Sequence, residues 1–315
     1  MSKQVKGALL TLLGGMCWGL SGTMGQYLFT RQGMDSRWLV PIRLGLAGLV
    51  LIAYCLLRWR KEVFAPWRTR RDALDLVIYG LLGVSGCQFL YFLTIQLSTA
   101  GAATILQDLS PVMILGVSCV AARRGPKPFE VVSILLALAG VFLLTTHGRL
   151  HQFAVSPAAL LTGCLSAVCV TVYNVQPKRL LGRFPVPVLQ SWAFLMGGAV
   201  FSLVFRPWRW GYVPNAMGCV GIAFVVLVGN VAAFVSFMTG VKLIGPDKAI
   251  LYGFSEPVTA ALLAALVLGT PFTLWDAVGF AAVFAMLALL SWGPRLWEKQ
   301  RPAEAARAVS PAEEP

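Results

Sequence analysis

The chain has 315 residues, 57% of them hydrophobic and 12% charged, and its mean hydropathy is +0.74. This composition excludes a soluble globular domain and indicates a membrane protein. The net charge of +13 would point to a nucleic-acid partner only if the basic residues formed one patch or arm. They are instead distributed over the loops between apolar segments, so we expect no nucleic-acid partner.

Apolar runs of about 20 residues recur along the whole chain, the length that a helix needs to cross a hydrocarbon layer of roughly 30 Å. The sequence predicts an all-α membrane protein with ten transmembrane helices, at 7–29, 38–57, 73–95, 101–121, 128–146, 157–176, 187–205, 216–240, 248–268 and 272–292. With an internal N-terminus, the inner segments hold 20 of the 26 Lys and Arg residues. This is the positive-inside bias, and it predicts that both termini are cytoplasmic.

Three further features concern the loops and termini. The densest basic segment, 58–71, is interpreted as a topology signal, with binding of anionic membrane lipid as the alternative. The tail at 294–315 is rich in Ala, Glu, Pro and Arg and is expected to be disordered in the cytoplasm. The seven cysteines show no Cys-x-x-Cys spacing, so neither a disulfide framework nor a zinc site is indicated, and no cofactor is expected.

Two segments of the chain also resemble each other in sequence. AATILQDLSPV at 102–112 pairs with DKAILYGFSEPV at 247–258, which aligns Pro111 with Pro257. Each copy contains five predicted spans, and because five is odd the second copy enters the membrane from the opposite side. We therefore expect a first repeat at 1–146 and an inverted second repeat at 147–293. Secondary transporters commonly have this arrangement, with the substrate site between the halves near the bilayer midplane.

The two aligned prolines predict helix breaks at matching depth. Pro111 has no N–H to donate to the carbonyl of Gln107, and Pro257 has none to donate to that of Gly253. Freed carbonyls in a membrane are tolerated where other helices or a water-filled cavity satisfy them. A simple kink and a cavity-lining break are equally compatible with the sequence.

Two carboxylates fall within the predicted spans, Asp108 in the fourth and Glu256 in the ninth. An acidic side chain near the bilayer centre costs roughly 2.5–3.5 kcal/mol on insertion scales, so each should face protein or water. Because their segments correspond in the repeat, we expect both to face one space. A protonatable Glu256 is a natural group for coupling transport to protons, and Asp108 is the second candidate.

Other polar and aromatic residues at similar depth predict a binding pocket for a small molecule, since such pockets are mostly apolar with a few placed polar groups. The predicted substrate-binding residues are Trp18, Ser21, Gln88, Tyr91, Gln107, Asp108, Tyr173, Asn174, Asn230, Tyr252 and Glu256. For each one, an interhelical hydrogen bond or plain packing is the alternative. Lys248, Tyr252, Glu256 and Thr259 are expected to form one polar stripe on the ninth helix.

Arg43 lies just inside the second predicted span. Three interpretations are open: the side chain snorkels outward, pairs with Asp108 or Glu256, or binds an anionic group of a substrate. Pairing or snorkelling is favoured.

These residues resemble a known family. The two five-helix halves, Trp18-Gly19, Arg43, LQDLSPV at 106–112 and SEPVTAALLAALVLG at 255–269 look like the EamA branch of the drug/metabolite transporter superfamily. The resemblance covers nearly the whole chain except the tail. It implies an inner-membrane permease, often an exporter of amino acids, metabolites or drug-like compounds, with a central cavity. Asp108 and Thr270 depart from the family pattern, and Asp108 suggests a cationic or zwitterionic cargo or a second proton site.

The leading hypothesis is therefore a secondary transporter, monomeric or homodimeric, that moves a small solute by alternating access. A passive channel or structural membrane subunit is the alternative, but it would not need two inverted halves with matching breaks. A membrane enzyme is disfavoured: His147 and His151 have i, i+4 spacing but fall in a loop with no companion ligands, so no metal site is expected.

Overall fold

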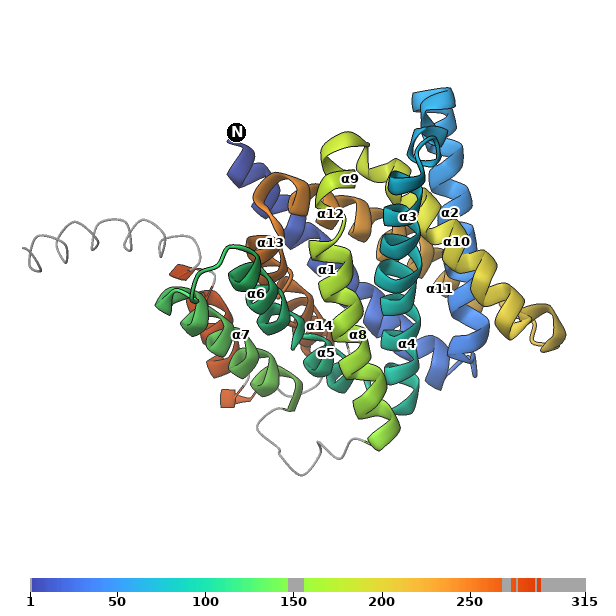
Figure 1. Ribbon diagram of the computed structural model, residues 1–315. Coiled ribbons are helices and arrows are strands. Elements are labelled where there is room, and N and C mark those ends of the chain that lie inside the picture. Colours follow the sequence, from blue (N-terminus) through green and yellow to red (C-terminus); the bar gives the residue numbers. More distant parts are fainter. Residues whose placement is uncertain (1, 147–155, 268–272, 276, 287, 290–315) are drawn as a thin grey trace, which may run out of the picture.

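The computed structural model describes residues 2–146, 156–267, 273–275, 277–286 and 288–289, and this part of the chain contains helices and no strand (Figure 1). The longer helices are α1 (Lys3–Thr30), α2 (Ser36–Trp59), α7 (Pro128–Thr146), α8 (Pro157–Val175) and α10 (Val186–Phe205). Shorter ones are η1 (Arg60–Trp67), α9 (Lys178–Arg183) and η4 (Pro207–Arg209), and residues 277–286 are also helical.

Seven of the described helices are long and apolar enough to cross a membrane, and 128–143 and 277–286 form shorter apolar helices. The all-helical, multi-spanning prediction is confirmed at this level. The expected tenth span is described only in parts, and the tail, His147 and His151 lie outside the described residues.

Two of the long rods contain an internal π-helical segment. The first rod consists of α3 (Arg70–Val77), η2 (Ile78–Ser85) and α4 (Gly86–Leu97), and the second of α11 (Ala216–Phe224), η5 (Val225–Ala232) and α12 (Ala233–Ile244). A π-segment widens the helical turn and changes the direction of the side chains that follow it. Such segments often occur at functional sites. Both segments border the site described below.

Two other rods are interrupted close to a proline. α5 (Ala100–Gln107) and α6 (Ser110–Ala121) are separated by a turn at 108–109, and α13 (Pro246–Tyr252) and α14 (Ser255–Val267) by one at 253–254. Pro111 and Pro257 lie in the first turn of the second helix, where a missing N–H costs little. The chain therefore starts a new helix at each proline instead of continuing the old one.

The bundle is organised around α1, which crosses it diagonally (Figure 1). α1 packs against α12 and α14, α2 packs against α10, and α4 packs against α8. Glycines allow the closest approach: a Cβ added at Gly15 would lie 2.7 Å from the carbonyl oxygen of Gly253, and one at Gly19 would lie 2.5 Å from that of Glu256. The broken backbone at 253–256 is thus held directly against α1.

Candidate functional site

A small cavity lies where α1, α2, α4, α5, α8, η5, α12 and α14 meet. Its volume is about 20 Å³, enough for about one water molecule. Seven of the eleven predicted binding residues line it: Trp18, Ser21, Gln88, Tyr91, Gln107, Tyr173 and Glu256. The remaining lining residues are Gly22, Arg43, Cys87, Phe92, Gly229 and Phe234. Residues from both sequence halves therefore meet at one point.

Glu256 is held at this point by a buried hydrogen-bond chain. Its side chain is 9% exposed, and Oε1 accepts a 3.0 Å hydrogen bond from the Tyr91 hydroxyl. Tyr91 Oη also lies 3.0 Å from Thr104 Oγ1, whose own hydroxyl is 2.9 Å from the Ala100 carbonyl. These hydrogen bonds connect the start of α14 to α4 and α5. A change in the charge of Glu256 therefore alters contacts with helices of the other sequence half.

Gln107 closes a second side of the cavity. Its Oε1 accepts a 2.6 Å hydrogen bond from Ser166 Oγ of α8 and a weak 3.6 Å contact from Cys87 Sγ of α4. Gln107 is the last residue of α5, immediately before the helix break. The amide therefore lies at the C-terminal end of α5, directly beside the break.

The aromatic wall is formed around Trp18. Its ring packs at 4.9 Å from the ring of Phe234 and at 4.7 Å from that of Phe237, while its indole N–H has no hydrogen-bond partner in the described chain. Phe92 and Phe234 were not predicted as lining residues. Helical spacing could have indicated Phe92, because it lies four residues after Gln88 on the same helix face.

Arg43 is buried in the cavity wall rather than extended to the membrane surface. Its side chain is 1% exposed, and its guanidinium lies 3.5 Å from the centre of the Phe92 ring. Within the described residues it forms no ion pair, and Nε and Nη2 have no hydrogen-bond partner. The favoured expectations of snorkelling or pairing with Asp108 or Glu256 are therefore wrong for this structure.

Four predicted residues do not line this cavity. Asp108 occupies the turn between α5 and α6, and its Oδ2 is buried with no hydrogen-bond partner in the described chain. Asn230 is buried on η5, again with both side-chain polar atoms unpartnered there. Asn174 donates to the Val170 carbonyl at 2.9 Å and lines a different cavity.

Tyr252 packs against a separate apolar cluster that includes Ile134, Leu251 and Phe254. The predicted stripe from Lys248 to Thr259 does not form, because the break at 253–254 resets the helical phase between α13 and α14. Lys248 consequently lines a different space from Glu256.

A much larger cavity of about 820 Å³ lies at one end of the bundle. It is lined by the ends of α6 and α8, by α9 and by the α12–α13 junction. Arg124, Lys178 and Lys242 outnumber Asp247 in its wall, so it is basic. It adjoins the small cavity along α8, where consecutive residues Tyr173 and Asn174 line one cavity each.

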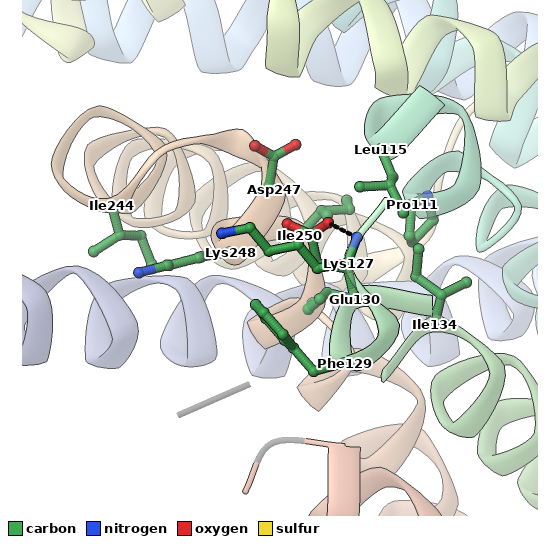
Figure 2. A pocket seen from close by; sticks show the side chains of 11 residues that line it. Pro111, Leu115, Lys127, Phe129, Glu130, Ile134, Ile244, Asp247, Lys248 and Ile250 are labelled. Carbon is green, nitrogen blue, oxygen red and sulfur yellow. Dashed lines mark hydrogen bonds between the residues drawn. The ribbon is translucent and has the colours of Figure 1, made fainter. Parts of the chain in front are cut away.

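A third cavity of about 230 Å³ lies between α6, the start of α7 and α13 (Figure 2). Its apolar wall includes Leu115, Ile134 and Ile250, and Lys127 donates its backbone N–H to Glu130 at 2.8 Å beside it. Asp247 belongs to both this cavity and the 820 Å³ one, and its Oδ1 accepts from Ser118 Oγ of α6.

An apolar helical bundle with broken helices, matching π-segments and a buried polar cavity defines a multi-pass membrane protein of the transporter class. The EamA-like transporter family matches residues 5–146 and again 157–292. The chain belongs to this family, a branch of the drug/metabolite transporter superfamily, and is a membrane transporter.

Its relatives agree with this assignment. The uncharacterized inner membrane transporter YicL of Salmonella typhimurium is 32% identical over 94% of this chain and 98% of its own length. The threonine/homoserine exporter RhtA of Escherichia coli K12 is 26% identical over 78% of each chain. A solved crystal structure superposes with a TM-score of 0.77 at 20% identity, covering 94% of this chain and 99% of the other. The family relationship supports a multi-pass protein of the inner membrane.

Proposed function

We propose that the protein is a secondary transporter, acting as an exporter, that moves a small metabolite, amino acid or drug-like solute by alternating access around the Glu256 cavity. The observation that carries the proposal is the buried cavity with a partly polar lining, to which helices of both halves contribute. RhtA, a relative, is an exporter of small amino acids, which supports cargo of similar size.

The proposal includes two inverted repeats of five helices each. The order of elements supports it, because a π-segment in the third rod is followed by a broken rod, and the same sequence of features recurs at η5 and α13–α14. The double match of the family supports it as well. An inverted pair gives a carrier two related conformations, one open to each side of the membrane.

The two ends of the bundle differ in a way that supports an inward-open conformation. The 820 Å³ cavity lies at the end with the basic loops, which the positive-inside rule assigns to the cytoplasm. At the other end, Gln26 Oε1 accepts from Ala100 N at 3.2 Å, Ser36 N donates to Gln96 Oε1 at 2.7 Å, and Tyr212 donates to the Gln32 carbonyl at 2.8 Å. These bonds close the outer end.

Asp35 belongs to the same closed end. Burial alone would raise the pKa of its carboxyl, but hydrogen bonds from Arg37 and Gln96 outweigh burial and hold the pKa below its usual range. The carboxylate is therefore ionised at neutral pH and continues to accept the 3.0 Å hydrogen bond from Gln96 Nε2.

The experiment is counterflow in proteoliposomes made with the purified protein. A solute that is a cargo exchanges against the same unlabelled solute inside the vesicle, so the labelled form accumulates transiently. A passive channel, the alternative, equilibrates the label without this overshoot. Leak without overshoot for every transported solute would refute the carrier proposal.

A further inference from the structure

The cavity contains a cation that has no ion-pair partner among the described residues. Arg43 is 1% exposed, forms no ion pair among the described residues, and has two guanidinium nitrogens without hydrogen-bond partners. Removing such a group from water without a partner is costly, and buried charges are normally paired. An anionic ligand in the cavity would supply the partner that Arg43 lacks.

The guanidinium is also held against an aromatic ring. It stacks over Phe92 at 3.5 Å from the ring centre, and Phe92 packs edge-on against Phe29 at 5.8 Å. This contact restricts the rotation of the guanidinium, and Nε and Nη2 on one of its N–H edges are buried without a hydrogen-bond partner in the described chain. A planar fork of N–H donors matches the two oxygens of a carboxylate, which it binds bidentately.

The rest of the lining restricts the charge of that ligand. Arg43 is the one cation among the residues that line the small cavity, and Glu256 lies in the same lining. A ligand with two negative charges would be repelled by an ionised Glu256, whereas a single carboxylate pairs with Arg43. Gln88 and Tyr91 offer hydrogen bonds to the remainder of such a molecule.

The cavity through which a ligand would reach the site also favours an anionic ligand. The adjoining 820 Å³ cavity contains Arg124, Lys178 and Lys242 against Asp247. A basic vestibule raises the local concentration of anions. Since the small cavity has room for only about one water molecule, the cargo enters only when the layer at Tyr173 and Asn174 opens.

We propose that Arg43 is the specificity-determining residue of the transport site and that it binds a carboxylate group of a singly anionic or zwitterionic cargo. This inference rests on the proposed transport function. It assigns to one residue the recognition of one chemical group.

The test uses the full-length protein purified in detergent. Thermal unfolding is measured with the proteinogenic amino acids, with short monocarboxylic and dicarboxylic acids, and with the amide of each acid. We expect at least one monocarboxylate to raise Tm and its amide to have no effect, because the amide cannot accept two charge-assisted bonds from the fork. R43Q should weaken binding of that acid by about tenfold or more, and R43K should weaken it less.

Arg58→Gln, an exposed position on the same helix, serves as the control and should bind like the wild type. If R43Q does not yield a monodisperse protein, R43K carries the test, since Lys keeps the charge but not the bidentate fork. The inference is overturned if no acid stabilises the protein, if an acid and its amide stabilise it equally, or if the Arg43 variants bind the acid within twofold of the wild type. Counterflow of an amide with unchanged efficiency would overturn this inference alone, whereas absence of counterflow for every solute would overturn the proposed function.

Discussion

At the scale of single residues, the cavity contains one acidic and one basic side chain, and the two differ in their contacts. Glu256 is bonded to Tyr91 at 3.0 Å, whereas Arg43 is stacked on Phe92 without a polar partner in the described chain. A carboxyl group can take up and release a proton, whereas a guanidinium is a fork of N–H donors that suits a carboxylate. We therefore propose that Glu256 couples transport to protons and that Arg43 recognises the ligand.

The first prediction concerns Glu256→Gln. The amide keeps the size and hydrogen-bonding capacity of the side chain but cannot release a proton, so transport driven by a pH gradient should fall at least tenfold while counterflow persists. Flux into proteoliposomes after a pH jump measures this. Glu62→Gln, an exposed position, should leave gradient-driven flux unchanged. Undiminished gradient-driven flux in Glu256→Gln would show that another group carries the proton.

At the scale of helices, α1 is stabilised by backbone contact with the broken rod α13–α14. Gly15 and Gly19 have no side chain, which brings α1 within contact distance of the carbonyls at 253 and 256. Small residues at helix interfaces allow this approach in membranes, where van der Waals packing rather than the hydrophobic effect drives association.

We predict that Gly19→Ala destabilises the protein by about 1–3 kcal/mol, because the new methyl group would lie 2.5 Å from the Glu256 carbonyl oxygen and force backbone to move. Thermal unfolding in detergent measures the effect. Gly45→Ala in α2 is the matched control, since no atom lies within 4 Å of its added Cβ. Equal Tm values for the two variants would contradict the packing described here.

A second helix-scale contact joins α3 to α9. Asp72 is 1% exposed, accepts hydrogen bonds from Arg183 Nη1 at 2.8 and 2.6 Å, and lies 2.9 Å from Arg179 Nη2. Thr69 Oγ1 also donates to Asp72 at 2.6 Å. Asp75 accepts from Arg179 at 2.6 Å but is 28% exposed.

Asp72→Asn should therefore lower stability by about 1–3 kcal/mol, because a neutral amide leaves Arg183 without its anionic partner and leaves Arg179 with Asp75 alone. Asp75→Asn should cost less, since water screens an exposed pair more strongly. Tm values of the two variants in detergent provide the comparison. A larger loss for Asp75→Asn would mean that exposure does not control the strength of these pairs.

At the scale of the whole molecule, the two ends of the bundle differ in both charge and openness. The basic end contains the large cavity, and the other end is closed by hydrogen bonds between loops and helix ends. An exporter that waits for cytoplasmic cargo needs this arrangement in its resting conformation.

The proposed orientation predicts which loops are accessible from outside the cell. Val213 is 84% exposed and belongs to a loop expected outside, whereas Gly125 is in a loop expected in the cytoplasm. In a variant without native cysteines, Val213→Cys should react with a membrane-impermeant maleimide in intact spheroplasts, and Gly125→Cys only after permeabilisation. Reversed labelling would place the large cavity outside and contradict export from the cytoplasm.

Much of the candidate site was accessible to sequence reasoning, because two rules apply to membrane helices. Polar residues at mid-depth are costly unless they face protein or water, so Gln88, Tyr91, Gln107 and Glu256 could be selected by depth alone. The internal repeat then showed that the segment containing Glu256 corresponds to a segment of the fourth predicted span. The same rules failed for Tyr252, since phase along a helix is lost at a break, and for Asn174, whose neighbour Tyr173 faces the small cavity instead.

The sequence by itself determined that the chain is helical and spans a membrane several times, because the length of an apolar run sets how far a helix reaches and proline sets where it must restart. Only the tertiary structure decided the partners of each side chain. It left Arg43 unpaired against Phe92, widened two rods into π-segments and separated Lys248 from Glu256. These outcomes depend on the direction in which each helix packs, and composition and hydropathy carry no information on that direction.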